Sequence, residues 1–542
     1  MRRRSFLAVI LTSIALHENC FATPSIPPNI TELKFDKDVL IHKSENKVDR
    51  EYLRDNDSFD YDFLFVNDKG AGVADLYVYH VEPKSLGFQS RDHVHTRKGG
   101  VWVKLDYYFT LEDFGAISDG VTDCSREISL ALNSGLVIRA VNKGVYLLRD
   151  TVRISAVSLN FMGFGKGRTV FLLNHINHGV VYDEPKNRND KRSVYLSDFT
   201  IKRLNSKVYK SEAGPKGLYV ANASPLRIHN VEECYGIGYG VHIDYSNDII
   251  VRSCHVHNHR DDMGGASGTD GIHIYRSENI LVENNVIHDV GDDAISTGSF
   301  DPKYTIRNAV IKNNYIYNTK SGIKIYSFAS DIKVNNNRIV NSREGGVYIT
   351  DDNNSINDAT VDNVVIKDNF FSSIGISSKS DESGALRIRF WPNKNTRSLI
   401  SNITFKENTI QDCLTGVSIL TYNPDKKAKD VYILGNIFKT TSKNEGANVE
   451  HRQLPYFIRV VQCYGDFMVS RNNFYANIPI LIKFDIAKIK GTKEELSAIF
   501  TFIDNRVQMF LKSKKMIEYF RNFECVTHYI IKRNQLLRLQ SE

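Results

Sequence analysis

The sequence has no dense block of basic residues, no CxxC spacing and only one long apolar run, and these absences exclude several classes of protein. The formal net charge of +7 is small for 542 residues, so a nucleic-acid-binding stripe is not expected. The seven cysteines are scattered, so a zinc module is not predicted, and lone buried thiols are favoured over disulfides. Beyond the N-terminus, no segment is long and apolar enough to span a membrane as a helix.

The first residues of the chain have the form of an export signal. Three arginines, Arg2 to Arg4, precede an apolar run from Phe6 to Leu16, and the small residue Ala22 closes the segment. A basic head, an apolar centre of about 7–15 residues and a small residue at the end describe a cleavable signal peptide. Arg3-Arg4-Ser5-Phe6-Leu7 also resembles the twin-arginine export pattern. We therefore expect residues 1–23 to be a signal peptide and the mature chain to be periplasmic or secreted, without an integral membrane segment.

An asparagine-centred repeat runs through the middle of the chain. Two copies read Val282-Glu283-Asn284-Asn285-Val286-Ile287 and Ile311-Lys312-Asn313-Asn314-Tyr315-Ile316. Cys254 takes the asparagine position in an earlier copy, and the later copies centre on Asn337, Asn369, Asn408, Asn436 and Asn472. The seven steps from position 254 to position 472 average about 31 residues, within the range of about 20–50 residues that is typical of solenoids.

Short strands follow most copies of this repeat, and a glycine usually opens them. Examples are Gly271-Ile272-His273-Ile274, Gly322-Ile323-Lys324-Ile325, Gly346-Val347-Tyr348-Ile349 and Gly416-Val417-Ser418-Ile419. The alternation of apolar and polar residues gives each strand one buried and one wet face. Because no helices separate the strands, a βαβ sheet is excluded. We predict an all-β fold, a parallel β-helix, in which the recurrent asparagine lies at a bend and hydrogen-bonds its equivalents above and below.

The segment Phe114 to Asp123 resembles the motif that opens the coil in the pectate-lyase-like superfamily of right-handed parallel β-helices. After it, residues 119–134 predict a helix that caps the open N-terminal end of the coil, with Thr122 or Asp123 as its N-cap. The apolar surface of this helix is expected to comprise Ile128, Leu130, Ala131 and Leu132.

Strand-like segments at residues 76–79 and 101–105 predict a small β-rich leader domain before the coil. The repeat weakens after about residue 485, where a helical stretch and a basic tail follow. We therefore divide the chain into a signal peptide at residues 1–23, a β-rich leader at 24–105, the β-helix at 106–490 and a C-terminal cap and tail at 491–542.

Three aspartates interrupt the glycine-apolar pattern on two neighbouring turns of the coil. Asp270 follows Gly268-Thr269, and Asp292 and Asp293 follow Gly291. Asp270 and Asp293 are 23 residues apart, close to one turn, and stacked strands lie about 4.8 Å apart, so we expect the three carboxylates to lie together on the wet surface. Like charges this close raise at least one pKa, which lets a protonated acid coexist with an ionised base. The alternative is structural, because aspartates at bends also bond to local backbone.

The segments Thr269-Asp270-Gly271 and Gly291-Asp292-Asp293 resemble the NTD and DD motifs of the polygalacturonase-type glycoside hydrolases, an inverting family of β-helices. The resemblance implies that Asp292 is the general acid and that Asp270 and Asp293 activate water. The Gly-His-Gly motif of that family is replaced by Lys320-Ser321-Gly322. Its substrate-binding Arg-Ile-Lys motif resembles Arg387-Ile388-Arg389, although the distance along the chain is longer than usual.

An outward column of side chains is expected beside the aspartates. At equivalent positions of successive strands it contains His273, Ser296, Lys324, Tyr348 and Arg387. Aromatic rings stack on sugar faces, and lysine and arginine pair with acidic groups. We therefore take His273, Lys324, Tyr348, Arg387 and Arg389 as candidate substrate-binding residues, with an ordinary solvated strand face as the alternative.

Histidines gather in the same part of the chain. His255, His257 and His259 alternate along one strand, and His242, His273 and His288 fall on adjacent turns. Because Val256 is expected to point inward, His255 and His257 are expected to point outward. Such a group can bind a metal or contact a sugar. Since no acidic ligand set accompanies it in the sequence, we assign no metal.

Three functions remain open at this point. The first is an exported hydrolase that cleaves an acidic polysaccharide with Asp270, Asp292 and Asp293 and needs no cofactor. The second is a polysaccharide lyase, which would use cationic residues and Ca²⁺. The third is a polysaccharide-binding accessory, without catalysis, of capsule or exopolysaccharide biosynthesis and export.

Overall fold

The chain divides into two units, Met1–Tyr108 and Phe109–Glu542, in the computed structural model. In the first unit the structure describes residue 108 and four strands. In the second it describes residues 109–182, 192–204, 214–259, 268–352, 358–378, 382–391, 397–421, 423, 425–440, 456–460, 464–476, 482–484, 498–509, 528–532 and 535–538. In this part of the chain, no helix is long and apolar enough to cross a membrane. The expected signal peptide lies outside the described residues.

The first unit contains one antiparallel sheet with the strand order β1-β2-β4-β3. Its strands are β1 (Phe63–Val66), β2 (Asp75–His80), β3 (His93–His95) and β4 (Val101–Lys104). The strands expected near residues 76–79 and 101–105 are therefore present.

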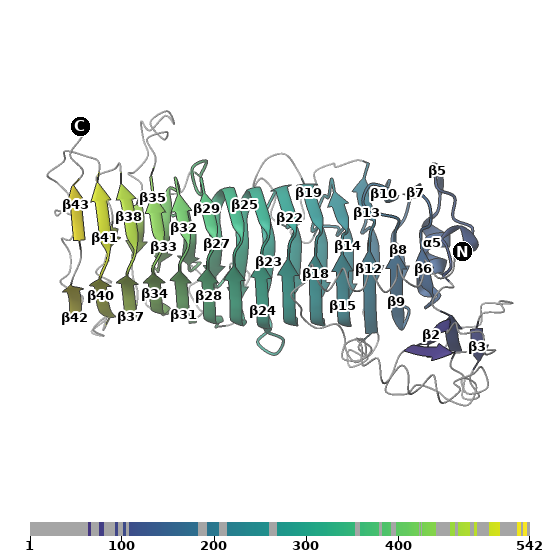
Figure 1. Ribbon diagram of the computed structural model, residues 1–542, viewed down its shortest axis with the longest axis horizontal. Coiled ribbons are helices and arrows are strands. Elements are labelled where there is room, and N and C mark those ends of the chain that lie inside the picture. Colours follow the sequence, from purple (N-terminus) through teal and green to yellow (C-terminus); the bar gives the residue numbers. More distant parts are fainter. Residues whose placement is uncertain are drawn as a thin grey trace. The chain divides into compact units, whose positions relative to one another are not determined.

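The second unit is a coil of parallel strands, in which each complete rung (one turn of the coil) contributes one strand to each of three stacks (Figure 1). The first stack is a 14-stranded sheet made of β6 (Val137–Arg139), β9 (Ser158–Met162), β12 (Arg192–Ser197), β15 (Ala223–His229), β18 (Asn247–Arg252), β21 (Glu278–Glu283), β24 (Ile306–Lys312), β26 (Ala329–Asn335), β28 (Thr360–Lys367), β31 (Ser398–Lys406), β34 (Lys426–Leu434), β37 (Tyr464–Ser470), β40 (Ala498–Ile503) and β42 (His528–Lys532).

Within each rung, the strand of the second stack comes directly after the strand of the first. It contains β5 (Asp119–Asp123), β7 (Gly144–Leu148), β10 (Thr169–Leu173), β13 (Thr200–Arg203), β16 (Glu232–Cys234), β19 (His255–His259), β22 (Val286–Val290), the first halves of β25 (Tyr315–Ser327) and β27 (Arg338–Thr350), β29 (Phe370–Ser372), β32 (Thr409–Gln411), β35 (Ile437–Lys439), β38 (Asn473–Ala476), β41 (Arg506–Met509) and β43 (Gln535–Arg538).

The third stack carries the candidate site. It contains β8 (Val152–Ile154), β11 (Val180–Tyr182), β14 (Leu218–Ala221), β17 (Val241–Asp244), β20 (Ile272–Tyr275), β23 (Asp293–Ser299), the second halves of β25 and β27, β30 (Gly384–Arg389), β33 (Thr415–Leu420), β36 (Tyr456–Val460) and β39 (Ile482–Phe484). Parallel strands continue to Arg538, so the stacking extends past the boundary at residue 490 that the sequence suggests.

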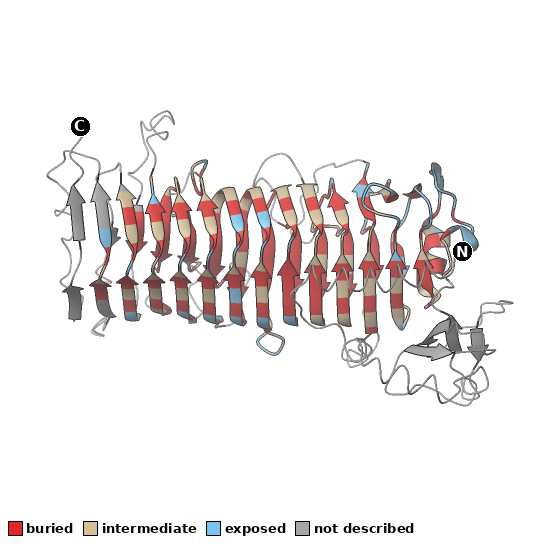
Figure 2. Cartoon of the chain, viewed as in Figure 1, coloured by how far each residue is buried: buried red, intermediate tan, exposed pale blue. Residues whose placement is uncertain are grey.

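The interior of the coil is built from the inward-facing residue of every second position. On β20, Ile272 and Ile274 are buried and stack on Ile295 and Thr297 of β23. In Figure 2, buried residues form red bands on the strands of successive rungs. Burial of such aliphatic columns removes apolar surface from water on every rung, which stabilises the coil without helices.

The recurrent asparagine forms a continuous ladder inside the coil, as the sequence predicts. The amide Nδ2 of Asn314 donates to Oδ1 of Asn337 at 2.9 Å, and Nδ2 of Asn337 donates to Oδ1 of Asn369 at 3.0 Å. The same bond joins each neighbouring pair among Asn285, Asn314, Asn337, Asn369, Asn408, Asn436, Asn472 and Asn505. At the start of the ladder, the backbone N–H of Cys254 donates to Asn285 Oδ1 at 2.8 Å.

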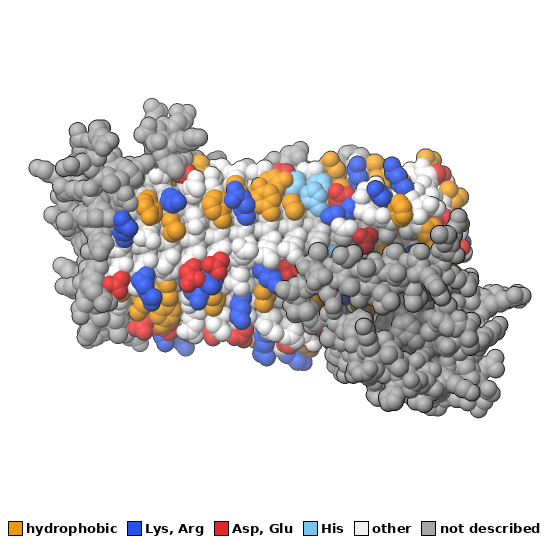
Figure 3. Space-filling view, in the orientation of Figure 1, with side chains coloured by type: hydrophobic (Ala, Val, Ile, Leu, Met, Phe, Trp, Pro, Cys, Tyr) orange, Lys and Arg blue, Asp and Glu red, His pale blue; other side chains and the backbone are white. Residues whose placement is uncertain are grey.

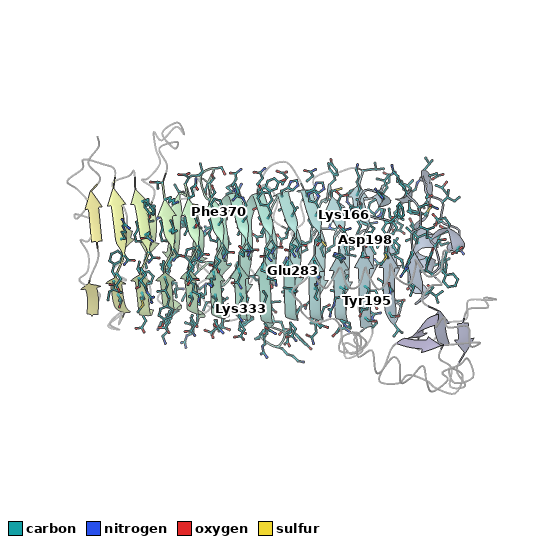
Figure 4. The ribbon with its side chains drawn as sticks, in the orientation of Figure 1. Lys166, Tyr195, Asp198, Glu283, Lys333 and Phe370 are labelled. Carbon is teal, nitrogen blue, oxygen red and sulfur yellow. The ribbon has the colours of Figure 1, made fainter. Side chains whose placement is uncertain are left out.

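Charged side chains also stack from rung to rung on the outside. Glu283 on β21, labelled in Figure 4, lies between Arg252 of β18 and Lys312 of β24, at 3.2 Å from each. Because neighbouring rungs place equivalent positions side by side, one carboxylate can pair with cations on both sides.

The helix α5 (Ser125–Asn133) lies where the sequence predicts a helix, after the short helix η1 (Glu112–Phe114), but neither predicted residue N-caps it. Cys124 occupies the N-cap position, while Thr122 Oγ1 donates to Asp119. The buried residues of the helix are Ile128, Ala131 and Leu132. Leu130 was expected among them but is 45% exposed, because it lies on the other side of the helix. The helix packs against β8 and β9, and its role as the cap of the coil stays a prediction.

Candidate functional site

The structure brings the three predicted aspartates together on two neighbouring rungs. Asp270 lies in the turn before β20, Asp292 lies just before β23, and Asp293 is the first residue of β23. One carboxylate oxygen from each lies within 4.8 Å of the others. We call Asp270, Asp292 and Asp293 the aspartate trio. All three residues are buried, at 3%, 7% and 2% exposure, so their charges are poorly solvated.

Asp270 is held by a histidine of the outer face. Its Oδ2 lies 2.6 Å from Nδ1 of His273, and its Oδ1 accepts the backbone N–H of Asp293 at 3.2 Å. The other ring nitrogen of His273 lies 3.1 Å from the hydroxyl of Tyr326, and Tyr239 stacks on the ring with centroids 4.5 Å apart. Since His273 alternates with the inward-facing Ile272 and Ile274, its ring lies on the outer side of β20. The trio was expected on the wet surface, but its side chains are buried there because neighbouring side chains cover them.

Two lysines partly neutralise the negative charge of the aspartate trio. Asp292 accepts a hydrogen bond from Lys320 Nζ at 2.8 Å and another from the backbone N–H of Gly268 at 2.9 Å. Lys324 Nζ lies 3.5 Å from Asp293 and 2.8 Å from Asp352, so its charge is shared between two carboxylates. The trio has the oxygen ligands that Ca²⁺ prefers, and two of its three carboxylates are paired with these ammonium groups.

Burial and mutual repulsion make the trio retain a proton. Burial and the charges of Asp292 and Asp270 raise the pKa of Asp293 to about 8, although Lys324 opposes the shift. Burial and the charge of Asp270 also raise the pKa of Asp292. Because these adjacent carboxyl groups interact, the retained proton belongs to the pair. Burial alone would lower the pKa of Lys324, but the charges of Asp293 and Asp352 outweigh it and hold that pKa well above its usual value.

The predicted outward column of side chains is present, but most of its side chains are not exposed to solvent. The register aligns His273, Ser296, Lys324, Tyr348 and Arg387 on successive strands, as expected. Arg387 is 1% exposed, however, and Tyr348 is 5% exposed with the guanidinium of Arg387 4.8 Å from its ring centroid. The column is therefore covered rather than solvated, because its large side chains pack on one another and on acidic neighbours.

The structure does not bring the Arg387-Ile388-Arg389 segment to the trio. Arg387 lies three strands beyond Asp293 in the third stack, about 14 Å at the usual strand spacing. It pairs with Glu344 at 3.1 Å and with Glu382 at 3.4 Å. Arg389 also pairs with Glu382, at 3.2 Å. These arginines are held by carboxylates of the chain itself.

Four residues in contact with the trio or with the residues that hold it were not predicted from the sequence. Lys320 was noted only as part of a departure from a motif, and Asp352, Tyr239 and Tyr326 were not singled out. Lys320 lies 28 residues after Asp292, about one rung, and this offset is a usable signal. The other three come from bends and neighbouring strands whose side-chain direction the strand period alone does not give.

The six histidines fall into three environments. His242 is in register with His273 and belongs to the third stack. His259 is fully buried beside Glu233, unlike His255 and His257, with which it alternates along β19. The difference arises at Asn258, whose φ of 58° interrupts the two-residue period of the strand.

His255 and His257 of β19 meet His288 of β22 and Glu232 of β16, and we call these four residues the histidine cluster. One nitrogen from each ring lies within 4.8 Å of the others. Glu232 was not noted from the sequence, although it lies 23 residues before His255, the same offset that relates Asp270 to Asp293.

The charges in the histidine cluster depend on one another. The hydrogen bond to His257, assisted by Thr200, lowers the pKa of Glu232 to about 2. Burial, with the charges of His257 and His288, lowers the pKa of His255 to about 4. Near neutral pH the cluster therefore presents an ionised carboxylate beside a neutral His255 imidazole.

Comparison with known proteins gives the handedness of the coil. The family model described as "Right handed beta helix region" matches residues 194–366. The chain is similar to the pre-neck appendage protein of Bacillus phage phi29, with 26% identity over 255 residues that cover 40% of this chain and 27% of that protein. It is also similar to exopolygalacturonase X-1 of Emericella nidulans, with 24% identity over 259 residues that cover 44% of this chain and 50% of that protein. The matches thus span between about a quarter and a half of these relatives.

The chain is also similar, at low identity, to two solved structures. The exopolygalacturonase of Thermotoga maritima has a TM-score of 0.44 and 14% identity, covering 62% of this chain and 88% of that one. The surface adhesin PfbA of Streptococcus pneumoniae has a TM-score of 0.45 and 15% identity, covering 74% of this chain and 90% of that one.

Proposed function

Because the chain is a right-handed parallel β-helix of the pectate-lyase-like superfamily, we propose that its aspartate trio hydrolyses glycosidic bonds of a polysaccharide. The observation that supports this most is the convergence of three buried carboxyl groups, from two rungs, within 4.8 Å on the outer face. A glycosidase needs one protonated and one ionised carboxyl group side by side, and the raised pKa of the adjacent pair supplies both states near neutral pH.

The roles follow the resemblance to polygalacturonase-type hydrolases. The proton that Asp292 and Asp293 share passes through Asp292 to the leaving oxygen. This transfer leaves Asp293 ionised, and with Asp270 it orients and deprotonates the attacking water. Asp270 suits this role because His273 fixes its position. Carboxyl groups of most inverting glycosidases lie roughly 6.5–9.5 Å apart. The trio is tighter than that, so the expectation of inversion rests on the resemblance and not on the spacing.

The lyase alternative is less well supported by the same residues. A lyase needs a base without its proton, but the raised pKa of Lys324 keeps this lysine protonated. It also needs a cation to neutralise the substrate carboxylate, and Arg387 is already paired with Glu344 and Glu382. Lys324 is therefore not available as the base, and Arg387 is not available to neutralise the substrate.

The charge of the site bears on the substrate. The four carboxylates of Asp270, Asp292, Asp293 and Asp352, one of them protonated, face the two ammonium groups of Lys320 and Lys324. The site is therefore slightly negative, which disfavours an acidic residue at the point of cleavage. We propose a neutral sugar there, in place of the acidic polymer that the sequence suggested, and an exported enzyme that meets its polymer outside the cytoplasm.

The experiment is a screen of the full chain against neutral and acidic polysaccharides. Hydrolysis yields new reducing ends, elimination yields unsaturated products that absorb in the ultraviolet, and an accessory protein binds without either signal. We expect reducing ends alone, lost in Asp292→Asn and retained in the control Asp331→Asn, which lies on β26 of the first stack. Unsaturated products, or full activity of Asp292→Asn, would refute the proposal.

A further inference from the structure

The histidine cluster takes no part in the hydrolysis proposed above. We propose that His255, His257, His288 and Glu232 form a binding site for one divalent transition-metal ion of the zinc class. Imidazole nitrogens with one carboxylate are the ligands that zinc takes in proteins. This site is separate from the aspartate trio, and its occupancy is testable without any substrate.

Three strands of the second stack bring the ligands together. His255 and His257 are alternate residues of β19, so both project from the same face, and His288 lies in register with His257 on the next rung. The Nε2 atoms of His255 and His288 are 2.9 Å apart. In a tetrahedral zinc site with Zn–N bonds of about 2.0–2.1 Å, two such nitrogens lie about 3.3 Å apart. Small side-chain rotations therefore suffice to admit an ion between them.

Carboxylates of the chain already orient the ligands. Asp289 Oδ2 lies 2.6 Å from Nδ1 of His288, which places the proton on that nitrogen and leaves the lone pair of Nε2 directed at His255. Thr200 Oγ1 donates to Glu232 Oε2 at 2.7 Å and leaves Oε1 beside the rings, 3.3 Å from His257 Nε2. A carboxylate behind a metal-binding histidine is the usual arrangement in metalloproteins.

The cluster is accessible from solution. The side chains of His255, His257 and His288 are 31%, 14% and 13% exposed. Figure 3 shows histidines gathered in one surface patch, over the part of the coil where β19 and β22 lie. Tyr317 stacks on His288 with centroids 4.4 Å apart, so a ring platform for sugars is the competing explanation. His257 also stacks on both His255 and His288. The convergence of one nitrogen from each ring, with the carboxylate of Glu232 beside them, favours the metal.

The test uses the untagged full chain, stripped with a chelator and then titrated with Zn²⁺ and, separately, with Co²⁺. We expect one ion per chain and, for cobalt, the intense visible bands of a tetrahedral complex. His288→Ala and His255→Gln should abolish saturable binding, and Asp289→Asn should weaken it by about 10–100-fold. The control His229→Ala removes a histidine of β15 in the first stack and should bind normally.

Two outcomes would overturn the metal site. One is the absence of stoichiometric binding by a chain whose circular dichroism shows it folded. The other is unchanged binding in both His288→Ala and His255→Gln. With either outcome, oligosaccharide binding that needs no metal and is lost in Tyr317→Ala would assign the patch to sugar instead. Because all readouts use metal or ligand binding, they stand whether or not the trio hydrolyses a substrate.

Discussion

Oδ2 of Asp270 lies 2.6 Å from Nδ1 of His273, and this pair joins the aspartate trio to the aromatic residues around it. The histidine contacts Asp270 through one nitrogen and the Tyr326 hydroxyl through the other. His273 is therefore a positioning residue for the carboxylate that we assign to water activation.

Replacing His273 by alanine should lower kcat by about tenfold or more, but by less than the roughly 10²–10⁴-fold expected from loss of the acid Asp292. The reason is that Asp270 would keep its charge but lose its orientation. Steady-state kinetics and the pH profile of kcat measure the effect. His273→Asn, which keeps a donor near Asp270, should recover part of the loss, and equal kinetics of the alanine and asparagine variants would contradict a positioning role.

The raised pKa of Asp293, about 8, predicts how stability depends on pH. The folded state holds the proton more tightly than the unfolded chain, where the group titrates near 3.8. The stabilisation from Asp293 is therefore fully present below about pH 4 and is lost as the pH rises through about 8. Urea unfolding between these limits should show a falling midpoint in the wild type and a smaller fall in Asp293→Asn. An unchanged slope in that variant would show that Asp293 titrates normally.

The same proton predicts the alkaline limb of the activity profile. If the Asp292–Asp293 pair supplies the acid, kcat should fall above about pH 8, where the pair loses its proton. Measuring kcat on the polysaccharide that is cleaved tests this directly. Activity that rises through pH 9 would exclude the pair as the acid.

The asparagine ladder makes a separate prediction about stability. Asn369→Ala removes one member of the ladder. The backbone N–H and the side-chain amide of Asn337 lose their shared acceptor, and Oδ1 of Asn408 keeps only the backbone N–H of residue 369, at a cost of about 1–3 kcal/mol in the free energy of unfolding. Asn336→Gly is the matched control, because Asn336 is exposed and its φ of 51° suits glycine. Chemical denaturation of both variants compares the two positions. Equal losses in the free energy of unfolding would mean that a buried ladder asparagine contributes no more stability than an exposed one.

A buried ion pair allows a double-mutant cycle. Nζ of Lys426 lies 2.6 Å from Oδ2 of Asp351 and 2.6 Å from the carbonyl oxygen of Trp391, with the lysine fully buried. Lys426→Met leaves Asp351 uncompensated and should cost about 3–5 kcal/mol in the free energy of unfolding. Adding Asp351→Asn should recover part of that cost. Additive costs in the double variant would show that the two groups are not coupled.

The coil was predictable because its repeat is a backbone property. Asn285 to Asn472 recur at one place in each rung, and the apolar alternation of strands such as Ile272-His273-Ile274 fixes which side is buried. The convergence of Asp270 with Asp293 was predicted from the length of the repeat, since 23 residues make one rung there. These inferences need only strand period and stacking distance.

The surroundings of the site were not predictable in the same way. Arg387 was expected on a wet face but lies under Glu344 and Glu382, which come from neighbouring segments. His255 and His257 were expected to point outward, and nothing in the sequence indicated that His259, two residues further on, is buried after the left-handed Asn258. Such local reversals depend on single φ values, which the period of a strand does not encode.

The spacing of the asparagine ladder also bears on how such a chain can change in length. Successive members are separated by 29, 23, 32, 39, 28, 36 and 33 residues, yet every pair keeps the same bond. The extra residues must leave the coil at its corners, so segments of ten or more residues can be gained or lost there without shifting the interior. The scaffold can therefore acquire new loops one rung at a time while the asparagine ladder stays unchanged.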